Sequence, residues 1–516
     1  MNISRRFFIG SAGSFGAFCG ARCFAAPAEL FTGGKPNLKF GVVSDIHITK
    51  IGEKEKMEAW GNNLTFRHTL EWFRDQGVDA VMVVGDMADK GMVEELEAVA
   101  DAWYKVFPND KAPDGHKVEK LFVTGNHDFH GYLYGDHAAK VYPDMAERKK
   151  HILRNNMGGW WRKIFHEDYS RFYRKDINGY TFLGAHWDDG TGMETNYGGS
   201  TFGVELAVFL AESSKSLNPA RPFFYFQHPH PKGTCYGAWA WGHDNGKATK
   251  ALAAYPNAVA FSGHSHYSLT DERSLWQGGF TSVGTSSLRY TGMPHNARLP
   301  AGYENGGAAG RDAWKYNGVK MTPTFSNASD CRQGMLWSVY DDHIVIQRRE
   351  FLSNMFVGND WVMPTGEAKP FAFAEHAKKI DAPEFPAGAK LKLTQVEHKN
   401  RGGKSRDGKK SIPSVRKDAI RIIIPAANPV NNARVWDYKV VAETAGTEKK
   451  TRFILANGFN HGIAHKRATA DSECIFALED FPADATVKFT VTPLNCFEKP
   501  GTPLVAKWKR SAPDYS

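Results

Sequence analysis

The chain has 516 residues, of which 42% are hydrophobic, 23% charged and 13% aromatic, and its formal net charge is +9. This is ordinary globular composition, which excludes disordered, collagen-like and coiled-coil chains, and the length predicts more than one domain. After residue 26 no apolar run approaches the roughly 20 residues that cross a bilayer, so we expect a mature protein without an integral membrane segment.

The N-terminus has the pattern of an export signal. The stretch from Ser4 to Ile9 contains paired arginines, and a weakly apolar, Gly- and Ser-rich segment follows it and ends in small residues near Ala26. This order is typical of a signal peptide, and the paired arginines resemble the twin-arginine signal. We predict a twin-arginine signal peptide over residues 1–26 and a periplasmic or secreted protein. A basic helix that stays on the chain is the alternative.

Four of the six cysteines lie outside this signal, at Cys235, Cys331, Cys474 and Cys496. An oxidising compartment permits disulfides, which leaves open whether Cys474 pairs with Cys496 and Cys235 with Cys331. The chain has no C-x-x-C motif, so a cysteine zinc site has no support.

Residues 38–357 alternate between strand and helix patterns, which predicts an α/β fold. Short apolar runs predict buried strands at Leu38–Val43, Ala80–Val84, Lys120–Thr124, Tyr180–Ala185, Pro222–Gln227, Ala258–Ser262 and Phe280–Val283. Helical patterns cover Leu64–Gln76 and Met92–Val106, and a hairpin joins Met335–Tyr340 to His343–Arg349. Residues 129–179 and 229–257 are interpreted as long, aromatic-rich insertions, which in other proteins often carry function.

The pattern changes after a Pro-punctuated connector near residues 381–386. Val487, Phe489 and Val491 alternate with Lys488 and Thr490, and this period of two predicts a small all-β sandwich. Residues from Pro383 onward carry 23 Lys and Arg against 14 Asp and Glu, and so account for the whole net charge. The densest basic run, residues 399–410, is interpreted as a solvated loop, with binding of a polyanion as the alternative.

Five short motifs stand where predicted strands end. They are Asp45-Ile46-His47, Gly85-Asp86-Met87-Ala88-Asp89, Gly125-Asn126-His127-Asp128, His228 and Gly263-His264-Ser265-His266. Ligands at the carboxyl ends of strands point into one crevice of an α/β sheet. On an extended segment, Asp45 and His47 point to the same side, and so do His264 and His266.

Each motif alone is weak, since a lone buried histidine is more often a hydrogen-bonded core residue than a ligand. All five in this order, each closing a strand, favour a metal site. The candidate ligands are carboxylates, one amide and imidazoles, and they include no thiolate. This set suits Mn, Fe or Zn better than Mg or Ca, which prefer oxygen ligands.

The five motifs resemble the pattern of the calcineurin-like metallophosphoesterase superfamily, which is D-x-H, G-D-x-x-D, G-N-H-[DE], H and G-H-x-H. The resemblance covers about residues 38–290 and implies a four-layer α/β sandwich whose closing hairpin reaches about residue 357. We therefore expect a catalytic domain over residues 36–357, a connector over 358–385 and a β-sandwich, fibronectin-III-like by pattern, over 386–516. Lys90 stands where protein Ser/Thr phosphatases have Arg, and Asp89 where purple acid phosphatases have Tyr, which disfavours both branches.

The resemblance also implies a ligand set for two transition-metal ions, divalent or trivalent. One ion would be held by Asp45, His47, Asp86 and His266, and the second by Asp86, Asn126, His228 and His264. Two such ions lower the pKa of a bridging water, so the expected reaction is hydrolysis of a phosphate monoester or diester by the bridging hydroxide. His127 is the predicted general acid, and the resemblance makes Asp89 the residue that orients it, in preference to Asp128.

Three weaker candidates could contact substrate. Trp239 and Trp241 could stack on a base or sugar or could simply pack down, and Arg289 could contact phosphate. His230 is interpreted as a supporting or surface residue. The expected substrate is a small phosphorylated molecule, with nucleic acid only as a substrate. The rival hypothesis is a non-catalytic binding protein whose basic sandwich holds a glycan or polyanion.

Overall fold

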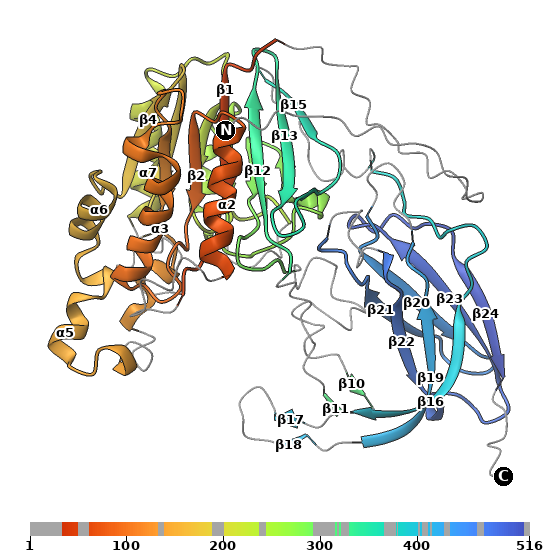
Figure 1. Cartoon of the computed structure of the whole chain (residues 1–516). Coiled ribbons are helices and arrows are strands. Elements are labelled where there is room, and N and C mark those ends of the chain that lie inside the picture. The colour runs from red at the N-terminus through yellow and green to blue at the C-terminus, as the bar shows by residue number, and fades with distance from the viewer. Residues whose placement is uncertain are drawn as a thin grey trace, which may run out of the picture. The chain divides into compact units, whose positions relative to one another are not determined.

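The part of the chain between residues 38 and 364 contains two central β-sheets, which are accompanied by helices (Figure 1). The structure is a computed structural model. The compact unit that contains both sheets begins at Lys35. The described residues are 34–49, 61–132, 139–187, 201–236, 244–292, 315–316, 319–320, 330–365, 378, 380–400, 403–404, 411–412, 415–427, 434–461 and 469–509. The predicted signal peptide, residues 1–26, lies outside them.

The first sheet has seven strands in the order β14-β13-β12-β1-β2-β3, and β15 also pairs with β13. Its strands are β1 (Leu38–Val43), β2 (Ala80–Val84), β3 (Glu119–Val123), β12 (Gln333–Val339), β13 (His343–Glu350), β14 (Met355–Phe356) and β15 (Trp361–Pro364). Strands β1, β2 and β3 are parallel, whereas β12 and β13 form the predicted antiparallel hairpin. Pairing with β13 continues to Pro364, and the domain limits given above remain predictions.

The second sheet has six strands in the order β4-β5-β6-β7-β9-β8. Its strands are β4 (Phe172–Ile177), β5 (Tyr180–Ala185), β6 (Phe223–Phe226), β7 (Ala258–Ser262), β8 (Leu275–Gln277) and β9 (Thr281–Gly284). Strands β5, β6, β7 and β9 are parallel, and the two edge strands run antiparallel to their neighbours.

Six α-helices of the described residues accompany these sheets: α2 (Gly61–Asp75), α3 (Val93–Val106), α5 (Met145–Lys150), α6 (Met157–Phe165), α7 (Phe202–Ser214) and α8 (Lys247–Leu252). Short 3-10 helices lie at Pro108–Asp110, His127–Tyr132, Leu153–Asn156, Glu272–Ser274 and Leu478–Asp480. The insertion predicted over residues 129–179 therefore contains α5, α6 and β4, and that over 229–257 contains α8. None of the helices of the described residues is long and apolar enough to cross a membrane.

The pleat of each strand sends its side chains into two separate cores. Ala80, Met82 and Val84 of β2 pack between the two sheets, where Phe40 has its ring centroid 5.0 Å from that of Phe224. Val81 of the same strand instead belongs to the core that the helices form with the sheets. Because both faces are covered, these strands are continuous apolar runs, and the four layers are helices, sheet, sheet and helices.

The region after residue 386 is an all-β sandwich, as predicted. Its three-stranded sheet contains β16 (Lys392–Asn400), β19 (Val415–Ile424) and β22 (Ser472–Ala477), and its four-stranded sheet contains β20 (Asp437–Glu443), β21 (Lys450–Leu455), β23 (Thr486–Leu494) and β24 (Leu504–Lys509). One apolar core joins the sheets and includes Val487, Phe489 and Val491.

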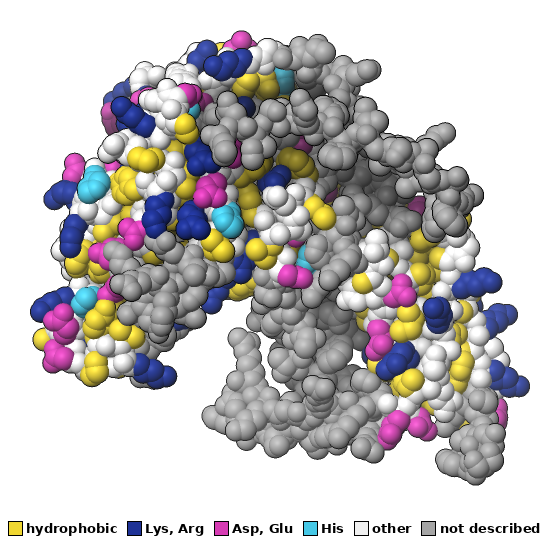
Figure 2. Space-filling view, viewed as in Figure 1, with side chains coloured by type: hydrophobic (Ala, Val, Ile, Leu, Met, Phe, Trp, Pro, Cys, Tyr) yellow, Lys and Arg dark blue, Asp and Glu magenta, His cyan; other side chains and the backbone are white. Residues whose placement is uncertain are grey.

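Short two-residue strands complete the described elements of the chain. They are β10 (Lys315–Tyr316), β11 (Val319–Lys320), β17 (Gly403–Lys404) and β18 (Ser411–Ile412). The basic run 399–410, interpreted as a loop, is partly strand, because β16 extends through Asn400 and β17 pairs with β18. Figure 2 shows one face of the molecule, on which the Lys and Arg side chains of the described surface are interspersed with Asp and Glu.

The disulfides that an oxidising compartment would permit are absent from the described residues. Cys235, Cys331, Cys474 and Cys496 are all described and buried, and no disulfide joins any two of them.

Buried His186 makes the stability of the fold depend on pH. The backbone N–H of Thr124 donates to its Nδ1 at 3.2 Å, and burial lowers its pKa to about 3. Unfolding restores a pKa of about 6.5, so the neutral ring contributes stability above pH 6.5 that is lost progressively as the pH falls toward 3. We expect His186→Asn, which keeps an acceptor but does not titrate, to lose less stability than the wild type between pH 7 and pH 5. Chemical denaturation at both pH values measures this, and equal losses in the two proteins would contradict it.

Candidate metal centre

The predicted ligands follow the carboxyl ends of five strands. Asp45 and His47 follow β1, Asp86 follows β2 and Asn126 follows β3, whereas His228 follows β6, and His264 and His266 follow β7. Backbone hydrogen bonds join these strand ends: Asp45 donates to Gly85 O at 3.1 Å, and Gly263 donates to His228 O at 2.9 Å. The strand ends of each sheet are therefore fixed to one another before any side chain is considered.

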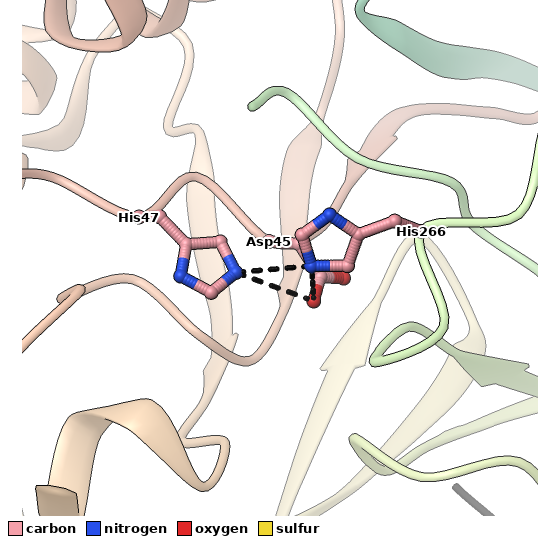
Figure 3. Close-up of side chains that lie close together, drawn as sticks. All are labelled: Asp45, His47 and His266. Atoms are coloured by element: carbon pink, nitrogen blue, oxygen red, sulfur yellow. Dashed lines mark hydrogen bonds and ion pairs between the residues drawn. The ribbon is translucent and has the colours of Figure 1, made fainter. Parts of the chain in front are cut away.

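Asp45, His47 and His266 form the first group of side chains (Figure 3). Oδ1 of Asp45 lies 3.1 Å from Nε2 of His266 and 3.7 Å from Nε2 of His47, and the two Nε2 atoms are 3.1 Å apart. All three residues are buried. Two ring nitrogens and a carboxylate oxygen thus point at one another.

Asp86, His228 and His264 form the second group, which is also buried. Nε2 of His228 lies 3.1 Å from Oδ2 of Asp86 and 4.0 Å from Oδ1 of Asp45. The same Oδ2 of Asp86 is 3.7 Å from Nε2 of His47 in the first group. Asp86 therefore lies between the two groups, and its role as a bridging ligand stays a prediction.

Three of the rings are held by an acceptor on the opposite nitrogen. Nδ1 of His228 donates to Val84 O at 2.7 Å, Nδ1 of His266 to Tyr290 O at 3.3 Å, and Nδ1 of His47 to Asp89 Oδ1 at 3.2 Å. Such a partner fixes the tautomer, so that Nε2 carries the lone pair toward the centre. The motifs did not reveal two of these three partners, because a backbone carbonyl leaves no trace in residue identity.

The carboxylates are held in the same way. Oδ2 of Asp45 accepts hydrogen bonds from Ser44 Oγ at 2.5 Å and from His264 N at 3.0 Å, while its Oδ1 is buried and accepts none. Oδ1 of Asp86 accepts from His127 N at 2.8 Å and leaves Oδ2 to face the rings. Each carboxylate thus keeps one oxygen for the site.

Five predicted ligands have left-handed backbone: Asp45, His47, Asp86, His264 and His266 have φ between 50° and 71°. This conformation is uncommon for residues other than glycine, and at functional sites it is maintained by the surrounding structure. The assumption of extended segments was therefore wrong. His264 and His266 belong to different groups, because tight turns rather than strand alternation direct their side chains.

The motif glycines make these close approaches possible. A Cβ atom on Gly85, whose φ is +85°, would overlap the ring of His228. A Cβ atom on Gly263 would come within 2.5 Å of Oδ2 of Asp45 and closer still to the Ser44 hydroxyl.

The pKa values of the candidate ligands reflect the competition between burial and the charges of neighbouring side chains. Burial alone would lower the pKa of His228, but the charge and hydrogen bond of Asp86, together with the Asp45 charge and the Val84 carbonyl, outweigh it and raise the pKa to about 9. Burial and the neighbouring His228 together lower the pKa of His264 well below its usual value. Burial would raise the pKa of Asp86, yet His228 and His127 hold it far below its usual value. A cation would replace these protons as the counter-charge of the carboxylates.

A divalent cation fits this chemistry. Each group offers three ligand atoms within 4.8 Å of one another, and the buried Oδ1 of Asp45 accepts no hydrogen bond from the protein. Carboxylate oxygens and imidazole nitrogens are the donors that first-row divalent ions accept.

Asn126 is buried beside the second group, since its neighbour His127 donates its backbone N–H to Asp86. Its role as a ligand stays a prediction. Trp239 and Trp241 lie outside the described residues. His230 is buried between Ser262 and Ser265, with hydrogen bonds of 2.7 and 2.6 Å, so it supports the β7 loop and is not a surface residue.

His127 and Asp89 lie next to the first group. Nδ1 of His127 donates to the backbone O of Asp89 at 2.8 Å, whereas the Asp89 carboxylate is 3.9 Å from that nitrogen. The carboxylate contacts three other residues instead: His47 Nδ1 and the Arg289 guanidinium at Oδ1, and Lys90 Nζ at Oδ2. Asp128 accepts hydrogen bonds from the backbone N–H groups of Ala88 at 2.8 Å and Gly125 at 2.7 Å.

The fold and site define an α/β protein with two groups of candidate metal ligands at the carboxyl ends of its strands. Residues 38–268 match the family described as calcineurin-like phosphoesterase, and this segment of the chain is a calcineurin-like phosphoesterase domain.

Solved structures resemble the chain at low sequence identity. A dimetal phosphatase from Danio rerio is 13% identical, with a TM-score of 0.36, and the match covers 65% of this chain and 100% of that one. Purple acid phosphatase PPD1 from yellow lupin (Lupinus luteus) seeds is 11% identical, with a TM-score of 0.33, and 64% of this chain covers 55% of it. A search of curated proteins gave no match.

Gly263→Ala should weaken the centre, because its new methyl group would collide with Ser44 and Asp45. We expect metal content per chain to fall severalfold after metal loading. Gly158→Ala, whose methyl group would meet only Tyr169 Cβ at 3.8 Å, is the matched control and should keep the wild-type content. Elemental analysis of both variants checks this, and a fully loaded Gly263→Ala protein would refute the packing argument.

Proposed function

We propose that the chain is an exported phosphoesterase with a binuclear centre of Mn, Fe or Zn ions that hydrolyses phosphate monoesters or diesters. One observation carries this proposal: Nε2 of His47 is 3.7 Å both from Asp45 Oδ1 and from Asp86 Oδ2, so two ligand groups share one space. When bound, a metal pair supplies an activated water nucleophile and neutralises the charge of the transferred phosphoryl group.

The protein groups around the centre would handle the proton of the leaving group. His127 is 24% exposed at its side chain, whereas the ligand carboxylates Asp45 and Asp86 are at most 1% exposed, so substrate would approach from its side. Because its Nδ1 donates to the Asp89 carbonyl, Nε2 is the nitrogen that would protonate the leaving oxygen. Orientation of His127 would therefore come from the Asp89 backbone, and the Asp89 carboxylate would orient His47.

Arg289 would contact the phosphate on the same side. Its side chain is 34% exposed, and one guanidinium nitrogen is paired with Asp89. The planar guanidinium carries further N–H donors that suit phosphate oxygens. A small phosphorylated substrate suits this arrangement.

The proposed export rests on residues 1–26 alone, and periplasmic or secreted location depends on it. The rival hypothesis of a polyanion-binding protein rests on the basic run 399–410, most of which lies outside the described residues. Two buried groups of carboxylates and imidazoles favour the enzyme, since a binding scaffold has no physical need for them.

The metal centre should be essential to the reaction. We expect close to two transition-metal ions per chain and hydrolysis of at least one member of a panel of phosphomonoesters and diesters after loading with Mn, Zn or Fe. Asp86→Asn should lose both, because it removes charge from the carboxylate shared by the two groups. Asp176→Asn on β4, outside both groups, is the control and should retain both. Elemental analysis showing no more than one ion in the loaded wild type would falsify the binuclear centre.

His127→Ala should keep its metal while kcat falls by about 10²–10⁴-fold, the usual contribution of a general acid. The loss should shrink for a nitrophenyl ester, whose leaving group barely needs a proton. His116→Ala, a half-buried histidine that contacts Asp114 and Val78, should leave kcat unchanged. Equal losses on alkyl and nitrophenyl esters would remove His127 from the acid role.

A further inference from the structure

The turn Gly458–His461, which connects β21 to β22 of the sandwich, contacts segments of the calcineurin-like domain. The backbone O of Asn460 accepts hydrogen bonds from Gln333 Nε2 at 2.8 Å, Cys331 Sγ at 2.9 Å and Ser268 Oγ at 3.2 Å. The preceding carbonyl, of Phe459, accepts from Thr270 Oγ1 at 2.5 Å. All four donors are buried, so two successive carbonyls of the sandwich are inserted into the polar interior of the first domain.

Gln333 connects this turn to two other segments. Its side chain is fully buried, and while Nε2 donates to Asn460, Oε1 accepts from Leu269 N at 2.7 Å and lies 3.1 Å from Ser268 Oγ. Oε1 also lies 3.3 Å from Ser286 Oγ, and the backbone N–H of Gln333 donates to Ser287 O at 2.9 Å. The side-chain amide of Gln333 therefore links the sandwich turn with residues 268–269 and with Ser286, and the backbone N–H of Gln333 adds the link to Ser287.

Both of these segments hold the first ligand group. Residues 268–269 begin two positions after His266, and Tyr290, three positions after Ser287, has the backbone O that accepts from Nδ1 of His266. Ser287 Oγ donates to Asp45 O at 3.0 Å, and Leu288 N donates to Ser44 O at 3.0 Å. A shift of either segment would therefore move Asp45 or His266, whose site atoms are 3.1 Å apart.

The hydrogen bonds of Gln333 differ from contacts that only hold the two domains together. Adhesion is also supplied outside this turn, where the Arg273 guanidinium lies 4.4 Å from the Trp436 ring centroid. Gln333 instead joins the sandwich to residues that touch the ligands themselves.

We propose that the Gly458–His461 turn is a positioning element of the metal centre, and that it acts through Gln333 on the segments that hold Asp45 and His266. This inference rests on the proposed function. It makes the sandwich part of the catalytic assembly, with Gln333, Ser268 and the Asn460 carbonyl as positioning groups that do not touch substrate.

Gln333→Glu tests this in the full-length chain. It keeps the acceptor for Leu269 but replaces the donor to Asn460 with a second oxygen. Changes in groups that orient metal ligands typically cost 10- to 100-fold in metal affinity, so we expect Mn²⁺ to bind about 10- to 100-fold more weakly. Excess Mn²⁺ should restore most of kcat, which a merely structural defect would not allow. Gln277→Glu, a buried glutamine on β8 that contacts Thr281, is the matched control and should bind Mn²⁺ like the wild type.

Ser268→Ala tests the same inference if Gln333→Glu fails to fold. It removes one donor to the Asn460 carbonyl and leaves the Gln333 amide in place. It should weaken Mn²⁺ binding severalfold without lowering the melting temperature of the metal-free protein more than Gln277→Glu does. Wild-type Mn²⁺ affinity in Ser268→Ala and in any folded Gln333→Glu would overturn the inference alone. A wild type that binds no metal and hydrolyses no ester would overturn the proposed function as well.

Discussion

Two buried carboxylates, Asp45 and Asp86, face the imidazole rings of His47, His228 and His266 across distances of 3.1 to 4.0 Å. Buried charge is costly unless it is paired and hydrogen-bonded, so this arrangement constrains everything near it. Each carboxylate gives one oxygen to protein donors and one to the centre. The left-handed turns, the motif glycines and the backbone acceptors behind the rings are the means by which the chain maintains that geometry.

The two sheets supply the rigidity that these turns need. Parallel strands β1, β2 and β3 end together in one sheet, and β6 and β7 end together in the other. The apolar core between the sheets, which contains Phe40, Phe224 and Trp337, holds one set of strand ends against the other. The residues that support the ligands include Ser287, which contacts Asp45, and Gln333, which contacts Ser287. The sandwich turn contacts Gln333 and so belongs to the same supporting network.

The sequence predicted what side-chain identity encodes. Strands β1, β2, β5 and β7 were predicted with their observed bounds, because strands buried on both faces are continuous apolar runs. Strand β4 was missed, since FYRKDI is only partly buried and lacks a clear alternation. The ligand groups followed from the motifs, whereas Tyr290 O, Val84 O and the Asn460 carbonyl did not, because every residue has a carbonyl. Sequence spacing likewise placed His264 and His266 on one side, and positive φ angles separate them.

The central claim is that two metal ions lie between these side chains. Anomalous X-ray diffraction from crystals of the metal-loaded protein tests it most directly. The account predicts two peaks roughly 3.5–4 Å apart, one next to Asp45, His47 and His266 and the other next to His228 and His264, with Asp86 between them. A single peak, or peaks away from these residues, would contradict it.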